Sequence, residues 1–155
     1  MHDQIDAALD LLAESPWGQT TQGQVTIALL RDKNDQGAIL ADEGTKNIAG
    51  YDPETGTILI DPDYAGDAAR LALVLGHEGT HAVQFEIRKN YIFDFMDERE
   101  AFDVTCILAK QLLGIDAYVT NQQIMDAYAG PNLFGTDYTP SSGEAKFNYS
   151  HVYLF

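Results

Sequence analysis

The chain has 155 residues, of which 45% are hydrophobic, and nine basic against 24 acidic side chains give it a formal net charge of -15. This length suits one domain with a core of its own, and the negative charge disfavours nucleic acids and anionic membrane surfaces as partners. The single cysteine, Cys106, cannot form an internal disulfide, and no apolar stretch reaches the ~20 residues that span a bilayer.

The first segment predicts an acidic amphipathic helix over residues 1–15. Ile5, Leu9 and Leu12 recur at helical spacing, and Pro16 ends the pattern. We expect this helix to pack on a sheet. It lacks the basic region and apolar core of a secretory signal, so we expect a cytoplasmic protein or one secreted by a signal-independent route.

A small twisted sheet is expected over residues 23–61. The segment 23–31 alternates loosely and is rich in β-branched residues, which indicates a strand. Further strands are predicted at 38–40, 46–51 and 57–60. The last two flank a turn rich in Asp, Pro and Gly, and we therefore expect them to form a hairpin.

Two long helices follow. The first is predicted over 67–88, with Asp63 or Asp67 available as its N-cap. The second is predicted over 97–113, with acidic residues in its first turn and Gly114 after its end.

Residues 114–155 are predicted to form a C-terminal helix and a tail. The helix covers 121–129, and the tail beyond it is rich in aromatic residues, so we expect it to wrap onto the body as loop and a short strand. The whole chain, 1–155, is thus predicted to be one compact α+β domain.

The most informative motif lies in the first long helix. His77, Glu78 and His81 spell H-E-x-x-H, and residues four apart lie on one helix face, so both imidazoles can reach a single Zn²⁺. The ion would lower the pKa of its bound water from near 16 toward about 7, and Glu78 could then take the proton. We predict that His77 and His81 are zinc ligands and that Glu78 is the catalytic base.

A zinc hydrolase site needs a third protein ligand, and the second long helix offers two. The residues that share a helix face with Glu98 are small or apolar, whereas the positions that follow Glu100 at the same spacing include the polar Asp103 and Gln111. We therefore favour Glu98 as the third metal ligand and keep Glu100 as the alternative. Gln84, one turn beyond His81, lies on the same face and could orient a ligand or the substrate.

The motif His77-Glu78-x-x-His81, followed by Glu98-x-x-Ala101, resembles the zincin metallopeptidases of the gluzincin type. It is most similar to the compact minigluzincins and related bacterial metallopeptidases, and the resemblance covers about residues 46–113. In that pattern the glutamate three residues before an alanine is the ligand. The resemblance thus also points to Glu98.

Two features depart from a single family pattern. Larger gluzincins place the ligand glutamate immediately before a small residue, which suits Glu100. Several families also place an acid four residues after the ligand glutamate to hold the first histidine, but here Phe102 follows Glu98 at that offset. Asp97 or Asp103 would have to serve instead.

The resemblance implies a zincin-like fold and zinc-dependent hydrolysis of peptide bonds in a peptide or protein substrate, with the zinc-bound water activated by Glu78. An edge strand within 46–60 would pair with an extended substrate. One alternative is a zinc-stabilised regulatory or binding module with little turnover, and another is an effector-type toxin protease. A pure binding module has no need for Glu78, so this residue distinguishes a peptidase from a binding module.

Overall fold

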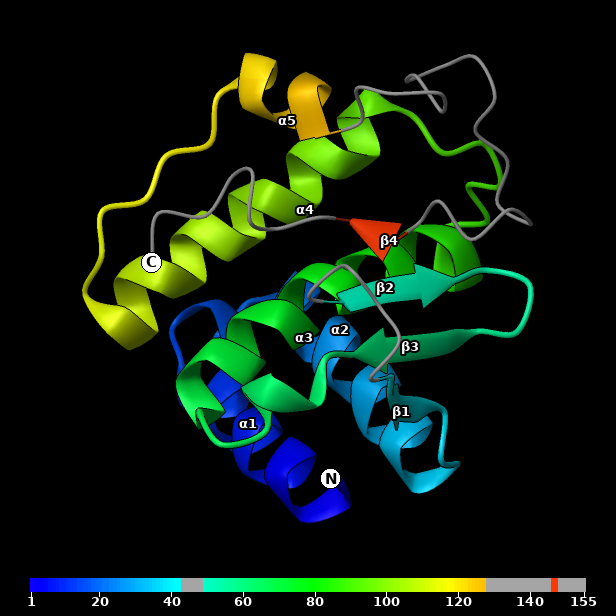
Figure 1. Cartoon of the computed structure of the whole chain (residues 1–155), viewed down its shortest axis with the longest axis vertical. Coiled ribbons are helices and arrows are strands. Elements are labelled where there is room, and N and C mark those ends of the chain that lie inside the picture. The colour runs from blue at the N-terminus through cyan, green and yellow to red at the C-terminus, as the bar shows by residue number, and fades with distance from the viewer. Residues whose placement is uncertain (43–48, 128–145, 148–155) are drawn as a thin grey trace.

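The computed structural model describes residues 1–42, 49–127 and 146–147 (Figure 1). Helices and a small sheet alternate along the chain in the order α1 (His2–Glu14), η1 (Trp17–Gln19), α2 (Thr21–Asp35), β1 (Ile39–Ala41), β2 (Ala49–Asp52), β3 (Thr57–Ile60), η2 (Pro62–Tyr64), α3 (Ala68–Ala82), η3 (Val83–Ile87), α4 (Phe95–Leu108), η4 (Ala109–Leu113), α5 (Asn121–Ala127) and β4 (Lys146–Phe147). The mixed α+β class predicted from the sequence is confirmed.

Helix α3 is the centre of the molecule. Every residue from Leu71 to Ala82 is buried, and the helix packs against α1, α2 and α4. Its N-terminus is capped by Asp67, whose side chain accepts a hydrogen bond from the backbone N–H of Arg70 at 3.1 Å. Of the two predicted caps, Asp67 is therefore the one used. The chain continues from α3 into the π-helical turn η3, so the predicted helix over 67–88 is confirmed.

The strand predicted over 23–31 is wrong, because this segment lies within the helix α2. Thr20 caps that helix by accepting from the N–H of Gly23 at 3.0 Å. Thr26, Ile27 and Leu30 are buried at helical spacing. Their packing against α3 outweighs the modest preference of β-branched residues for strands.

The sheet is correspondingly smaller and has the strand order β1-β3-β2-β4. Strand β1 pairs parallel with β3, and β2 pairs antiparallel with β3, which confirms the predicted hairpin. Strand β4 pairs antiparallel with β2, as expected for a short strand in the tail. The rest of the predicted tail, 128–145 and 148–155, lies outside the described residues.

Helix α1 does not pack on the sheet as predicted. Its apolar face, with Ile5, Leu9 and Leu12 fully buried, lies against α3 and α2.

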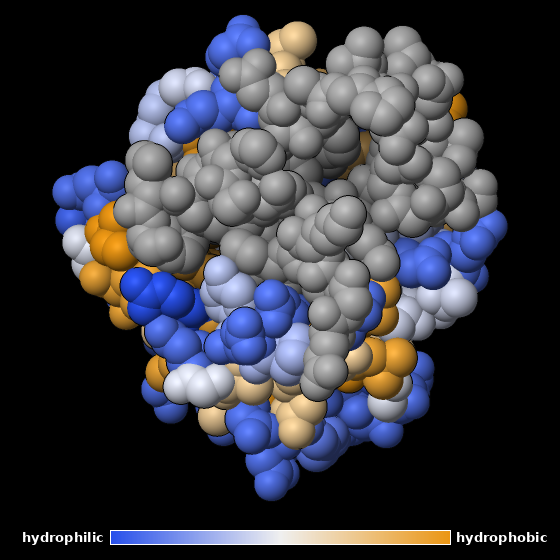
Figure 2. All heavy atoms as spheres, in the orientation of Figure 1, coloured by the Kyte–Doolittle hydropathy of each residue, from blue (hydrophilic) through white to orange (hydrophobic). Residues whose placement is uncertain are grey.

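In Figure 2, the described part of one face shows hydrophobic residues in small groups between hydrophilic ones. No helix among the described residues is long and apolar enough to cross a membrane.

Helix α4 lies along α3 and begins with a capping box. The side chain of Asp94 accepts from the N–H of Asp97 at 3.2 Å, and Asp97 accepts from the N–H of Asp94 at 2.9 Å. The helix ends through η4 at Gly114, whose φ of 68° is left-handed, as the sequence predicted. Gly76 permits the close approach of α4, because a Cβ there would lie 2.5 Å from Leu108 Cδ1.

Candidate metal centre

Two adjacent helices bring three metal-ligating side chains together. His77 and His81 lie one turn apart on α3, and Glu98 lies in the first turn of α4. Oε1 of Glu98 is 2.5 Å from Nε2 of His81, and its Oε2 is 3.6 Å from Nε2 of His77. The potential ligand atoms all lie within 4.8 Å of one another, and this is the one such cluster among the described residues.

The geometry and surroundings of this cluster fit a metal ion. Tetrahedral coordination with bonds near 2.0–2.2 Å places ligand atoms about 3.3 Å apart, and the observed separations of 2.5 and 3.6 Å lie on either side of that value. Nε2 of His81 and both carboxylate oxygens of Glu98 are buried, and beyond their contacts within the cluster they make no hydrogen bond to any described residue. An ion would satisfy these buried atoms. Two imidazoles and a carboxylate suit zinc, and they also suit other first-row ions.

Thr105 orients the first histidine. Its hydroxyl donates to the carbonyl oxygen of Ala101 at 3.1 Å and lies 3.1 Å from Nδ1 of His77. Since the hydroxyl has one proton, the oxygen accepts from the Nδ1–H of His77, and the lone pair of Nε2 is left on the side of Glu98. Thr105, rather than Asp97 or Asp103, is therefore the residue that contacts Nδ1 of this histidine.

The two aspartates have other contacts. Asp97 closes the capping box of α4, and Asp103 pairs with Arg99 at 2.8 Å. Sequence reasoning missed Thr105, although a signal was present: it follows Glu98 by seven residues and lies on the same inward face of α4.

Gln84 orients the second histidine, as the sequence suggested. Its Oε1 lies 2.9 Å from Nδ1 of His81. Its Nε2 donates to the carbonyl oxygen of Asp97 at 2.9 Å and to Oε1 of Glu100 at 2.8 Å. These two acceptors fix the orientation of the amide, so the Nδ1–H of His81 donates to Gln84 and Nε2 faces Glu98.

Glu100 does not belong to the ligand cluster. Its carboxylate accepts from Arg88 at 2.6 and 2.9 Å as well as from Gln84. The structure therefore brings Glu98 to the histidines and leaves Glu100 one contact further out, where it supports Gln84.

Burial and neighbouring charges shift the pKa values of the three cluster residues in different directions. Burial lowers the pKa of His77 to about 4, although Glu98 acts in the opposite direction. Burial also opposes the charged form of His81, but the charge of Glu98, with a smaller effect of Glu78, outweighs it and raises the pKa to about 9. Burial likewise raises the pKa of Glu98, but the two histidines outweigh it and lower that pKa to about 2. One proton thus lies between His81 and an ionised Glu98.

Aromatic rings and Glu78 complete the described surroundings. Phe102 packs edge-on against His77 with ring centroids 4.5 Å apart, and Phe93 lies 5.0 Å from His81. Glu78, between the histidines in sequence, is fully buried. Charges in such an apolar environment interact more strongly than they do in water.

Comparisons with models of known protein families, with curated proteins and with solved structures find no match to this chain. The similarity to gluzincins consequently rests on the motif and on the positions of the candidate ligands. Membership of that family and the zincin fold remain predictions.

Proposed function

We propose that this protein is a zinc-dependent peptidase in which His77, His81 and Glu98 hold the ion and Glu78 is the general base. The observation that carries the proposal is the buried cluster, in which Thr105 and Gln84 turn both Nε2 atoms toward one carboxylate. A cluster with its histidines oriented in this way is what a catalytic zinc site requires of its protein ligands.

When bound, the ion supplies Lewis acidity that polarises a peptide carbonyl and favours the ionisation of water. Glu78 takes a proton from the attacking water as the new C–O bond forms at the carbonyl carbon. It then delivers that proton to the amide nitrogen as the C–N bond breaks, so one water is consumed and an acid and an amine are produced. Its place beside His77 in the same helix turn supports this role.

A second candidate function is a metal-stabilised binding module with little turnover, and one observation favours it. Glu78, His77 and Glu98 are fully buried, and His81 is only 2% exposed. Hydrolysis requires a substrate to reach these groups, whereas a structural metal site does not. If the protein is a binding module, Glu78 should matter only for its stability.

Replacing Glu78 with glutamine tests the proposal, because the change removes the base and keeps the side chain's size. Zinc content and melting temperature should stay near those of the parent, while peptide cleavage falls by about 10²–10⁴-fold. Glu54→Gln, which removes an exposed carboxylate from the hairpin turn, is the matched control and should cleave like the parent.

The substrate panel should contain unfolded proteins and basic peptides, since a chain with a net charge of -15 attracts cations at low ionic strength. Unchanged cleavage by zinc-loaded Glu78→Gln contradicts the peptidase mechanism. Absence of cleavage by the zinc-loaded parent across the whole panel supports the second candidate instead.

A further inference from the structure

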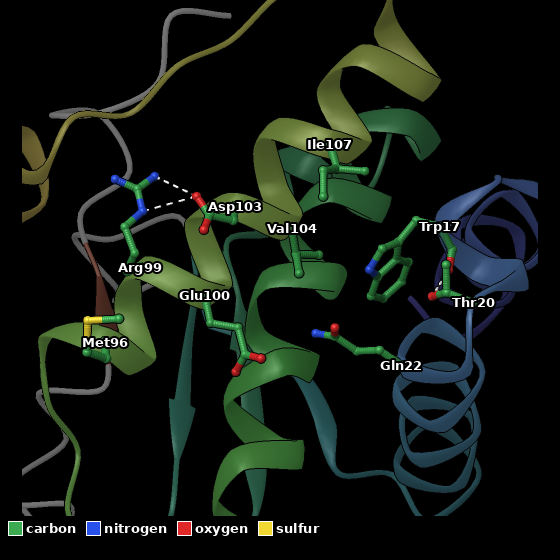
Figure 3. Close-up of a pocket in the computed structure, with 9 residues that line it drawn as sticks. All are labelled: Trp17, Thr20, Gln22, Met96, Arg99, Glu100, Asp103, Val104 and Ile107. Atoms are coloured by element: carbon green, nitrogen blue, oxygen red, sulfur yellow. Dashed lines mark hydrogen bonds and ion pairs between the residues drawn. The ribbon is translucent and has the colours of Figure 1, made fainter.

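A pocket lies between α4 and the stretch formed by η1 and the first turn of α2. Its volume is about 460 Å³, within the range of pockets that hold small organic or peptide ligands. Trp17 and Gln22 line one side, and Glu100, Val104 and Ile107 of α4 line the other (Figure 3). His77, His81 and Glu98 do not line it, although Glu100 does and also accepts a hydrogen bond from Gln84 beside the metal cluster. The pocket is therefore a site distinct from the metal centre.

Two polar groups in this pocket have unused hydrogen-bonding capacity. Trp17 is only 5% exposed, and its indole N–H makes no hydrogen bond to any residue in the described part of the chain. Its backbone N–H, by contrast, donates to Oε1 of Gln111 at 3.0 Å and fixes the residue in place. The side-chain amide of Gln22 is similarly unpaired within the described ranges. Figure 3 shows both groups turned toward the space beside α4.

Among the charged side chains around the pocket, the carboxylates can accept further hydrogen bonds, whereas most N–H groups of the arginine are already engaged. Arg99 donates to Asp103, to the carbonyl oxygen of Val119 and to Asn121, so most of its N–H groups are engaged. Asp103 receives these bonds on Oδ1, and its side chain is 59% exposed. Oε2 of Glu100 accepts one bond, from Arg88. A carboxylate can accept about four bonds in all, so Glu100 and Asp103 can each accept a further bond from a basic side chain, although each already pairs with an arginine.

We propose that this pocket binds a peptide segment that carries a bulky apolar side chain beside a lysine or arginine. The apolar side chain packs between Trp17, Val104 and Ile107. The peptide group pairs with the amide of Gln22, which both donates and accepts, while the indole N–H donates to a backbone carbonyl. The basic side chain reaches the acceptors of Glu100 and Asp103. This binding does not depend on the proposed peptidase activity.

Trp17 is the only tryptophan in the chain, so its fluorescence reports directly on occupancy of the pocket. We would titrate the zinc-loaded full-length protein at low ionic strength with the probe acetyl-Leu-Arg-Leu-amide and with acetyl-Leu-Glu-Leu-amide as the charge-reversed control. We expect a saturable change in emission, with the arginine peptide binding at least about fivefold more tightly. Mass spectrometry of the probe after titration verifies that it is intact.

Two matched substitutions locate the binding. Ile107 is 44% exposed and lines the pocket, so Ile107→Ser should weaken binding of the arginine peptide by about five- to tenfold. Ile87 is 48% exposed and lies outside the pocket lining, so Ile87→Ser should bind like the parent. Circular dichroism and the melting temperature check that both variants fold.

Equal affinity for the two peptides, an unchanged affinity in Ile107→Ser, or no saturable change up to millimolar peptide would each overturn the proposal. The readout is the fluorescence of Trp17 rather than cleavage. A negative binding result therefore leaves the peptidase proposal intact, and loss of peptidase activity leaves the peptide-binding proposal intact.

Discussion

Replacing Thr105 with valine should weaken zinc binding without unfolding the protein. Valine keeps the β-branched shape of this fully buried residue but removes the oxygen that lies 3.1 Å from Nδ1 of His77. The imidazole then loses the contact that fixes its tautomer, and its Nδ1–H is left without this acceptor in a buried position.

The expected magnitude follows from the role of the contact. Loss of a group that orients a metal-bound histidine typically costs about 10–100-fold in metal affinity, which corresponds to about 1.4–2.8 kcal/mol. An unsatisfied buried N–H costs about 1–3 kcal/mol, a range that agrees with this estimate. Thr105→Ser restores the hydroxyl and should bring zinc affinity back to within a few-fold of the parent.

The assay is a competition titration against a chelator of known zinc affinity, with melting temperature measured on the same samples. Thr80→Val is the matched control. Thr80 is 1% exposed, lies on α3, and donates its hydroxyl to the carbonyl oxygen of Gly76 at 2.7 Å, much as Thr105 donates to Ala101. It should change stability but not zinc affinity. Equal zinc affinities for Thr105→Val and Thr80→Val would show that the Thr105 hydroxyl does not orient His77 for zinc.

Three further predictions concern the ligands, the protons and the packing. Glu98→Ala should weaken zinc binding by orders of magnitude while Glu100→Ala stays within about tenfold, as competition titrations would show; the reverse order would transfer the ligand role to Glu100. The pKa of His81 near 9 means that zinc must displace a proton at neutral pH. The zinc Kd should therefore fall about tenfold per pH unit from about pH 6.5 to about pH 8.5, and a flat profile would contradict this. Gly79→Ala should lower the free energy of unfolding by about 1–2 kcal/mol in urea denaturation, because its Cβ would lie 2.8 Å from Leu30 Cδ1; an increase would show that helix propensity outweighs the clash.

The sequence predicted the helices of the candidate site well because their signals are local. Asp67 caps α3 and Gly114 ends η4, and both belong to short patterns with a clear physical cause. Glu98 could be preferred over Glu100 because only small or apolar residues share its helix face, whereas the face of Glu100 includes Asp103 and Gln111. The structure places Glu98 beside the histidines accordingly.

The features that the sequence did not predict depend on contacts between distant segments. Thr26 and Leu30 lie in a helix because they pack against Gly79, and no local pattern in 23–31 reveals that neighbour. The contact between Thr105 and His77 joins two helices across 28 positions.

Anomalous diffraction at the zinc absorption edge, from crystals grown with zinc, tests the metal site most directly. We expect one peak bonded to Nε2 of His77, Nε2 of His81 and a carboxylate oxygen of Glu98, at about 2.0–2.2 Å from each. A peak that is coordinated by Glu100 in place of Glu98, or no peak at this cluster in the presence of excess zinc, would contradict it.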